Sequence, residues 1–183
     1  FRRVLFRSAT FLKDNVYNIP PFLSIDVKNP SITDTYVLIS AASILEKTIP
    51  CLQRPGQKFG TNIQDCCSQI LMNSSKSAII RSTVNLLLVV TTSLTKRFDR
   101  VWILFFKIFR LLDSYSKKPD LQEKELIVSR RMILVMSHLA RAFDLNHSDY
   151  KPKKFNDINI FQKILSMILI FIKKDRKSTR LNS

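Results

Sequence analysis

The sequence has very little glycine, cysteine and histidine. Only 2 glycines occur in 183 residues, whereas an average usage of about 7% would give roughly 13. Because glycine serves the tight turns of β-hairpins and the phosphate loops of nucleotide-binding folds, its scarcity argues against both. With 45% apolar and 24% charged residues, the composition is that of a globular protein. These features together favour an all-α fold.

The cysteines and histidines also restrict the chemistry. The three cysteines, Cys51, Cys66 and Cys67, form no CxxC pair and no Cys/His cluster, so buried free thiols are a better interpretation than a metal site. His138 and His147 lack HExxH spacing, and no nucleophile motif lies near them. General acid–base and nucleophilic catalysis both need convergent groups with tuned pKa values. The sequence therefore predicts a protein that is not an enzyme and holds no cofactor or metal.

No segment near the end of the chain is apolar over a full membrane thickness. The run from 164 to 172 is about half the roughly 20 residues that a transmembrane helix requires, and Lys163 and Lys173 flank it. No signal peptide is visible. We expect no membrane partner.

Both ends of the chain resemble a translated sequencing adapter. Residues 1–8 read FRRVLFRS and residues 175–183 read DRKSTRLNS. If the first is encoded as TTC AGA CGT GTG CTC TTC CGA TCT, its reverse complement, read one base out of frame, encodes Asp-Arg-Lys-Ser-Thr-Arg-Leu. The alternative is two unrelated basic tails. We expect residues 9–174 to be the natural protein, open at both ends.

The chain is strongly basic, with a formal net charge of +16. Leaving out the two terminal segments removes six positive charges and one negative charge, so +11 remains on residues 9–174. A positive charge of this size suggests a polyanionic partner such as DNA, although net charge also serves solubility.

Apolar residues recur at helical spacing in six segments, which we expect to be helices. The first runs from 33 to 49, with Thr33 or Asp34 as its cap, and the second from about 61 to 73. The third runs from 77 to 96, and the fourth starts near 99. Asp120 is expected to cap the fifth, which runs to about 143, and Asp157 the sixth, whose buried seam should include Phe161, Leu165, Ile168 and Ile172. Residues 9–32, which contain Pro20, Pro21 and Pro30, are expected to be a connector or a partial repeat.

The spacing of these helices is that of a repeat protein. The first, third and fifth begin near Thr33, Ser77 and Asp120, at intervals of about 44 and 43 residues, and HEAT and armadillo repeats have a period of roughly 40 to 47 residues. Three helix pairs that bury their apolar faces against the next pair would form an α-solenoid. We expect a HEAT-type segment over residues 33–174; an irregular helical bundle is the alternative.

Seven basic residues are candidates for contacts to DNA phosphates: Lys96, Arg100, Lys107, Arg110, Lys151, Lys153 and Lys154. The first four fall within an arc of about 80° if one continuous helix carries them. The last three form a cluster in the loop before the sixth helix. The alternative is a solvated helix face that Asp99 and Asp113 partly balance. The aromatic residues between 102 and 109 follow the apolar period, so we expect them to pack in the interior rather than to stack on bases.

Three stretches occur in an order that points to a known family. They are IPCLQRPGQKFGTNIQDCCSQI, IIRSTVNLLLVVTTSLTKRFDRVWILFFKIF and SRRMILVMSHLARAFDLNHSDYK. From about Tyr36 to Lys174 the chain resembles the HEAT-repeat body of the Nipped-B-like cohesin loader family, also called adherin. The most recognisable points are Arg54-Pro55, Val101-Trp102 and the run from Leu139 to Lys151. These residues pack or end helices, so it is their joint order that carries the resemblance.

The resemblance implies a hook-shaped solenoid in the nucleus that binds chromatin DNA and cohesin subunits and promotes cohesin loading for sister chromatid cohesion. The ATPase would belong to cohesin. A tetratricopeptide-repeat partner would bind through a region near the full protein's N-terminus, outside this sequence. The segment 116–127 is shorter here than in the family, which puts contacts by that loop in doubt. The alternative is a HEAT or armadillo scaffold that binds only proteins, such as a transport receptor or an assembly factor.

Overall fold

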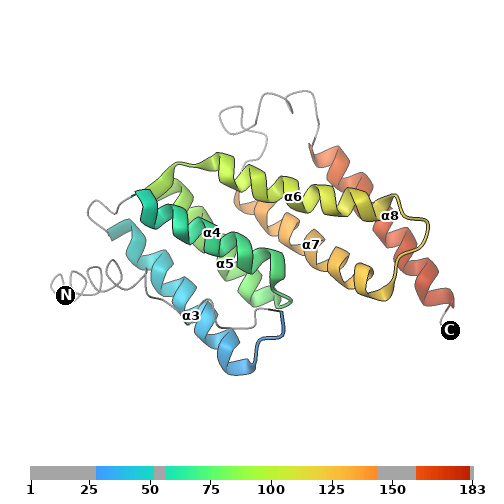
Figure 1. The fold of residues 1–183 in the computed structure, drawn as a ribbon, viewed down its shortest axis with the longest axis horizontal. Coiled ribbons are helices and arrows are strands. Elements are labelled where there is room, and N and C mark those ends of the chain that lie inside the picture. Colours follow the sequence, from blue (N-terminus) through green and yellow to red (C-terminus); the bar gives the residue numbers. More distant parts are fainter. Residues whose placement is uncertain (1–27, 52–56, 144–159, 182–183) are drawn as a thin grey trace. The chain divides into compact units, whose positions relative to one another are not determined.

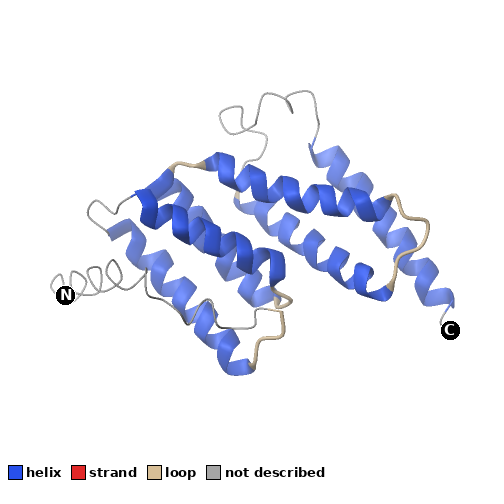
Figure 2. Cartoon of the chain, in the orientation of Figure 1, coloured by secondary structure: helices blue, strands red, loops and turns tan. Residues whose placement is uncertain are grey.

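The computed structural model describes residues 28–51, 57–143 and 160–181, and all regular secondary structure in these ranges is helical (Figure 2). Figure 1 shows α3 (Ile32–Thr48), a 3₁₀ turn η2 (Ile49–Cys51), α4 (Gln57–Asn73), α5 (Ser77–Val90), a π-helical turn η3 (Thr91–Thr95), α6 (Phe98–Ser116), α7 (Glu123–Ala142) and α8 (Ile160–Leu181). The predicted all-α fold is confirmed, and each of the six predicted helices corresponds to one α-helix.

The chain divides into two compact units at the Arg97–Phe98 bond. The first unit contains α3, α4 and α5, and the second contains α6, α7 and α8. Within each unit the helices pack against one another, as they do in a segment of an α-solenoid. The first and third predicted helix pairs each lie inside one unit, whereas the members of the middle pair, α5 and α6, belong to different units.

The central helix of the first unit is α5, which packs against both α3 and α4. Its buried residues are Ile79, Ile80, Thr83, Val84, Leu86, Leu87 and Val90, so more than one of its faces is covered. Leu38 from α3 and Ile70 from α4 meet Ile79 in one apolar cluster. Contact with two neighbouring helices explains why α5 is so rich in apolar residues, with an unbroken apolar run from Leu86 to Val90.

One helical stretch in the described residues, Ser77–Thr95, is long and apolar enough to cross a membrane by length and composition alone. Half of it is buried inside the unit, and α5 contacts helices on two sides. Because the central helix of a packed core passes the same test, the stretch is weak evidence for a membrane span. The expectation of no membrane partner stays a prediction.

The start of α3 differs from the prediction that Thr33 or Asp34 is its cap. Ser31 is the N-cap, because its Oγ accepts a hydrogen bond from the Asp34 N–H at 3.0 Å, and Asp34 Oδ2 accepts one from the Ser31 N–H at 3.1 Å. This reciprocal pair is a capping box. Asp34 therefore acts as the third helical residue of the motif, and α3 begins one residue earlier than predicted.

Between α5 and α6 the helical path is interrupted. Residues 91–95 form a π-helical turn, and Lys96 ends it in the left-handed region at φ 53°. The side-chain amide of Gln64, from α4, donates to Thr91 Oγ1 at 2.9 Å and to the Arg97 carbonyl at 3.4 Å. Gly60, also on α4, lies so close that an added Cβ would stand 2.5 Å from Thr95 Cγ2. These contacts hold the π-turn against α4. The predicted helix from about 77 to 96 is confirmed as far as Thr95, but its last turn is π-helical instead of α-helical.

In the second unit, α6 buries the apolar stripe that its sequence predicts. Val101, Leu104, Phe105, Ile108 and Leu112 are all buried, together with Trp102. They pack against α7 and α8, whose buried side chains include Met132, Val135, Met136, Leu139, Met167 and Phe171. A stripe about 100° wide or more is what a helix covered by two neighbours needs.

The seam predicted for α8 is displaced. Leu165 and Ile172 are 58% and 45% exposed, whereas Met167 and Phe171 are buried. Almost every residue from 164 to 172 is apolar, so the pattern alone does not identify the buried face. Phe161 and the predicted cap Asp157 lie outside the residues whose side chains the structure describes.

The α6–α7 turn is held by polar contacts. Gln122, not Asp120 as predicted, is the N-cap of α7, and Glu125 completes a capping box. The Lys118 ammonium donates to Glu125 Oε1.

From α8, the ammonium of Lys174 donates to the carbonyl oxygens of Tyr115 and Ser116 at 3.2 and 2.8 Å, and to that of Lys118. A cation at the carbonyl end of α6 favourably opposes the negative end of the helix dipole.

Candidate nucleic-acid interface

Three of the predicted phosphate-binding residues share one side of α6. Arg100, Lys107 and Arg110 fall within an arc of about 80°; Lys107 and Arg110 are exposed and Arg100 is half-buried. We call these three residues the α6 basic face. At 100° per residue Lys107 and Arg110 point away from the buried stripe, whereas Arg100 lies closer to its edge, which agrees with its partial burial.

The ends of α6 carry the acidic residues, so the middle of the helix is purely basic. Asp99 lies in the first turn, where it suits the positive end of the helix dipole. Asp113 lies in the last turn, and its Oδ2 is 2.6 Å from Lys117 Nζ. From 100 to 112 the helix contains no carboxylate. The central turns of α6 therefore carry only positive charge, and the two carboxylates flank the α6 basic face at its ends.

Arg110 is stacked on an aromatic ring. Its guanidinium carbon lies 5.6 Å from the centre of the Phe106 ring, and the Phe106 and Phe109 rings are 6.0 Å apart. A cation–π contact uses the flat face of the guanidinium and holds the side chain in place. A guanidinium held in this way can still donate from its N–H groups, and the reduced freedom of the side chain lowers the entropy cost of a contact with an anion.

The aromatic residues of α6 are mainly structural, as predicted. Trp102 and Phe105 are 2% and 1% exposed, and their rings meet edge to face at 5.7 Å. Phe106 and Phe109 are half-buried. Sequence periodicity did not show that Phe106 would also support Arg110, although the i, i+4 spacing of the two residues is the signal that could have indicated it.

Lys96 does not belong to the α6 basic face. The arc of about 80° required a continuous helix, but Lys96 ends the π-turn of the first unit and its ammonium donates to the Thr92 carbonyl of its own turn. That condition is not met, so one helical arc does not carry all four residues, and Lys96 stays a separate predicted phosphate contact. Lys151, Lys153 and Lys154 lie outside the described residues.

The cysteines divide by burial. Cys67 is buried and Cys66 half-buried, whereas Cys51 is exposed. Burial raises the pKa of the Cys66 thiol, and it raises the pKa of Cys67 far above its ordinary value, because a thiolate is poorly solvated in an apolar interior. The two neighbouring thiols are thus held in the neutral, unreactive form.

Neither histidine takes part in a metal cluster that the structure describes. In residues 28–51, 57–143 and 160–181, no three or more His, Cys, Asp or Glu side chains come together so that they could hold a metal ion. His138 is half-buried on α7, and His147 lies outside these ranges.

Comparison with known proteins gives one group of relatives. The chain is 23% identical to Nipped-B-like protein of Homo sapiens over 146 residues, which are 76% of this chain and 5% of that protein. It is 26% identical to Nipped-B-like protein B of Danio rerio over 161 residues, 85% of this chain and 5% of the relative. With Nipped-B-like protein A of Danio rerio it shares 20% identity over 169 residues, 89% and 7% of the two chains.

The chain thus spans about one twentieth of the length of the relatives it matches. No protein-family model matches it, and no solved structure matches it significantly. These findings relate the chain distantly to Nipped-B-like proteins over most of its length.

Proposed function

We propose that this chain is a segment of a cohesin-loader-type HEAT scaffold, which contacts DNA and acts in the nucleus on chromatin. Distant similarity to Nipped-B-like proteins over most of the chain supports the family assignment. The helical packing within each unit agrees with a solenoid segment. The observation that carries the DNA contact is the α6 basic face, with Lys151, Lys153 and Lys154 as an additional candidate cluster.

The geometry of the α6 basic face suits a phosphate backbone. Arg100 and Arg110 are ten residues apart, or about 15 Å along the helix axis, which corresponds to four or five nucleotides at about 3.4 Å each. Arginine can bind a phosphate through two parallel N–H groups, and Lys107 adds a mobile point charge between them. Such contacts position a protein on DNA without reading its sequence, so we expect binding with little base preference.

In the whole protein, this DNA contact would help to bring cohesin subunits onto chromosomes for sister chromatid cohesion. The energy of ATP hydrolysis would come from cohesin, and the proposal gives this chain no catalytic residue. Its contribution is a rigid, positively charged surface at a fixed place in a helical scaffold.

The proposal can be tested with a charge-matched pair of variants. We expect R100Q/K107Q/R110Q to bind a short DNA duplex about tenfold more weakly than the unaltered chain, as measured by fluorescence anisotropy, since each phosphate contact adds to affinity. The control is K47Q/K76Q/R81Q, which removes the same charge from exposed residues of the first unit. Equal loss in both triple variants would mean that only net charge matters and would contradict a contact by α6.

A scaffold that binds only proteins is the second candidate, and Ile103 favours it. This side chain is 54% exposed and lies inside the arc of the α6 basic face. An exposed apolar residue surrounded by arginine and lysine also suits a protein interface. In that case R100Q/K107Q/R110Q would leave DNA affinity unchanged. If α6 contacts DNA, the reverse result is expected.

A further inference from the structure

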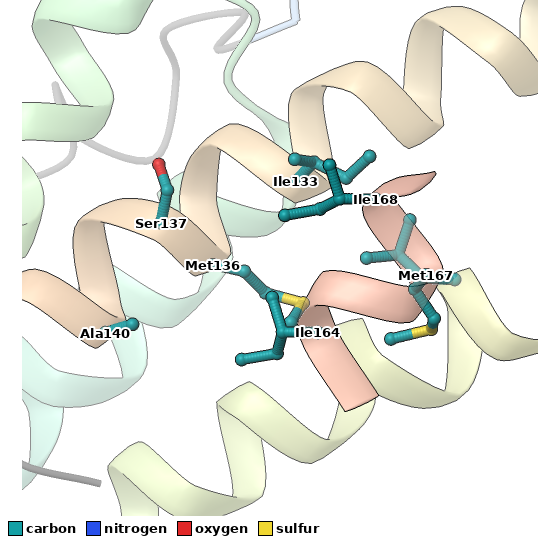
Figure 3. A pocket seen from close by; sticks show the side chains of 8 residues that line it. Ile133, Met136, Ser137, Ala140, Ile164, Met167 and Ile168 are labelled. Carbon is teal, nitrogen blue, oxygen red and sulfur yellow. The ribbon is translucent and has the colours of Figure 1, made fainter. Parts of the chain in front are cut away.

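A partly open apolar groove runs between α7 and α8 in the second unit. Six of its lining residues are Ile133, Met136 and Ala140 from α7, and Ile164, Met167 and Ile168 from α8. Its cavity volume is small, about 60 Å³. Figure 3 shows Met136 beside Ile164 and Ile133 beside Ile168, with Ser137 at the edge on α7. We call it the α7–α8 groove.

The edges of this groove are unusually apolar for an exposed surface. On α8, Leu165 and Ile172 are 58% and 45% exposed, and helical spacing places both on the same side as Ile168. On α7, Ile127 is 54% exposed as well, but it lies beyond the lining residues, about 15 Å before Ser137 along the helix axis. Apolar side chains gathered around a groove mark an interaction site.

The charge of the two walls indicates what the groove would accept. Residues 126–142 of α7 and 160–174 of α8 contain no aspartate or glutamate. Arg130 and Arg141 are exposed on α7, seven residues before Ser137 and four after it, so both lie on the side of the groove edge. A basic partner would be repelled here, and an acidic one attracted.

We propose that the α7–α8 groove binds an amphipathic helix of another protein, whose apolar face is flanked by acidic residues. Ile133 and Ala140 are seven residues apart, about 10 Å, which matches the distance between the first and last anchors of a helix with apolar residues at i, i+4 and i+7. The flexible side chains of Met136 and Met167 can adjust to such anchors. Arg130 and Arg141 would meet the acidic flanks. This proposal does not depend on a DNA contact by α6.

The test uses the whole 183-residue chain and labelled synthetic peptides. One peptide carries leucine at i, i+4 and i+7 with glutamate at the flanking positions; a second has lysine for glutamate, and a third alanine for leucine. We expect the acidic leucine peptide to bind at least about tenfold more tightly than either of the others in fluorescence anisotropy. Equal affinity for the glutamate and lysine peptides, or binding by none of them, would overturn the proposal.

A matched pair of variants locates the site. S137W should fill the edge of the groove and reduce affinity for the acidic peptide about tenfold, while S114W on α6 should change it less than about twofold. The two serines are closely matched, because both are exposed and each donates its hydroxyl hydrogen to the carbonyl three residues earlier, at 2.8 and 2.7 Å. Equal affinities of S137W and S114W would show that the peptide binds elsewhere, against the proposal.

A second variant keeps the test valid if S137W fails to fold, which circular dichroism would show. R141E should reduce affinity for the acidic peptide severalfold and raise affinity for the lysine peptide, whereas R81E in the first unit should do neither. Sedimentation tests whether a second copy of the chain occupies the groove instead. The acidic-helix proposal is wrong if the chain self-associates, if S137W abolishes that association, and if no peptide binds.

Discussion

Two strongly apolar helices, α5 in the first unit and α8 in the second, are buried to very different extents. In α5, seven residues are buried against α3 and α4. In α8, Met167 and Phe171 are buried, while Leu165, Leu169, Ile170 and Ile172 are exposed. The apolar content of a helix thus does not show how much of that helix is buried, because the neighbouring helices determine its burial. The described apolar side chains of α5 are mostly covered within the first unit, whereas several of those on α8 stay exposed in the second.

The largest expected effect comes from truncating one leucine in each of these two helices, which tests the difference in burial directly. Leu87 is 1% exposed and Leu169 is 50% exposed. L87A removes a buried side chain and leaves a cavity, so it should lower the free energy of unfolding by about 2 to 5 kcal/mol. L169A should lower it by less than about 1 kcal/mol, because much of that side chain is already in water. Urea denaturation followed by circular dichroism gives both values, and similar losses would contradict the comparison.

A second prediction concerns the close contact between α4 and the π-turn. In G60A the new Cβ would stand 2.5 Å from Thr95 Cγ2, so we expect a loss of about 1 to 3 kcal/mol from overpacking, although alanine is the better helix former by about 1 kcal/mol. The control is G60A/T95S, which removes Cγ2 but keeps the hydroxyl that accepts the Arg97 N–H. The double variant should recover most of the stability; no recovery would show that the clash with Thr95 is not the cause.

A buried hydrogen bond between α4 and the π-turn of the first unit should contribute less to stability. Thr91 Oγ1 accepts a hydrogen bond from the buried Gln64 amide at 2.9 Å. T91V keeps the shape but leaves an N–H without its acceptor, which should cost about 1 to 3 kcal/mol. Adding Q64M removes the donor as well and should restore part of the loss. The thermal midpoint measures this, and a midpoint in T91V equal to that of the unaltered chain would contradict a role for this hydrogen bond.

The smallest effect is expected from the surface pair Lys118–Glu125 in the second unit. The hydrogen bond from Lys118, followed by that from the Gln122 backbone, lowers the pKa of Glu125, and the bond to Glu125 raises the pKa of Lys118. A lowered carboxyl pKa stabilises the fold above the ordinary value of about 4.3, and this contribution is lost as the pH falls through the folded pKa. The raised ammonium pKa stabilises below about 10.4, and that contribution is lost as the pH rises through the folded pKa.

Thermal midpoints from pH 2 to 11 would test this pair. E125Q should flatten both the acid and the alkaline ends of the curve by a small amount, because the pair lies at the surface, where water screens the attraction between the two charges. The effect should shrink further in about 1 M salt. E46Q, which removes another glutamate from the first unit, is the control; an identical curve for E125Q and E46Q would contradict the shifts.

The sequence allowed the existence and order of the helices to be predicted, because each has a clear apolar period or a start and stop signal. The stripe of α6 from Val101 to Leu112 is the best example. The change to π-helical hydrogen bonding after Val90 could not be predicted, since Thr91 to Thr95 can continue an α-helix and the π-turn depends on contacts with Gly60 and Gln64 from another helix. Nor does the sequence show that Lys96 takes up a left-handed conformation, which ends the helical path before Arg100.

The surfaces of the second unit were harder to predict. The run from Ile164 to Ile172 is apolar on all sides, so only the packing of α6 and α7 selects Met167 and Phe171 for burial. The α7–α8 groove depends on side chains from separate helices and leaves no local signal. The α6 basic face could be predicted, because Arg100, Lys107 and Arg110 belong to one helix whose opposite side is strongly apolar.

The salt dependence of DNA binding tests the central claim most directly. For the unaltered chain and for R100Q/K107Q/R110Q, the logarithm of the association constant is measured against the logarithm of the salt concentration. Each lost phosphate contact should reduce the steepness of the slope by about 0.9, so three lost contacts should reduce it by roughly 2.7. A slope in the triple variant that equals the slope of the unaltered chain would show that α6 does not contact DNA.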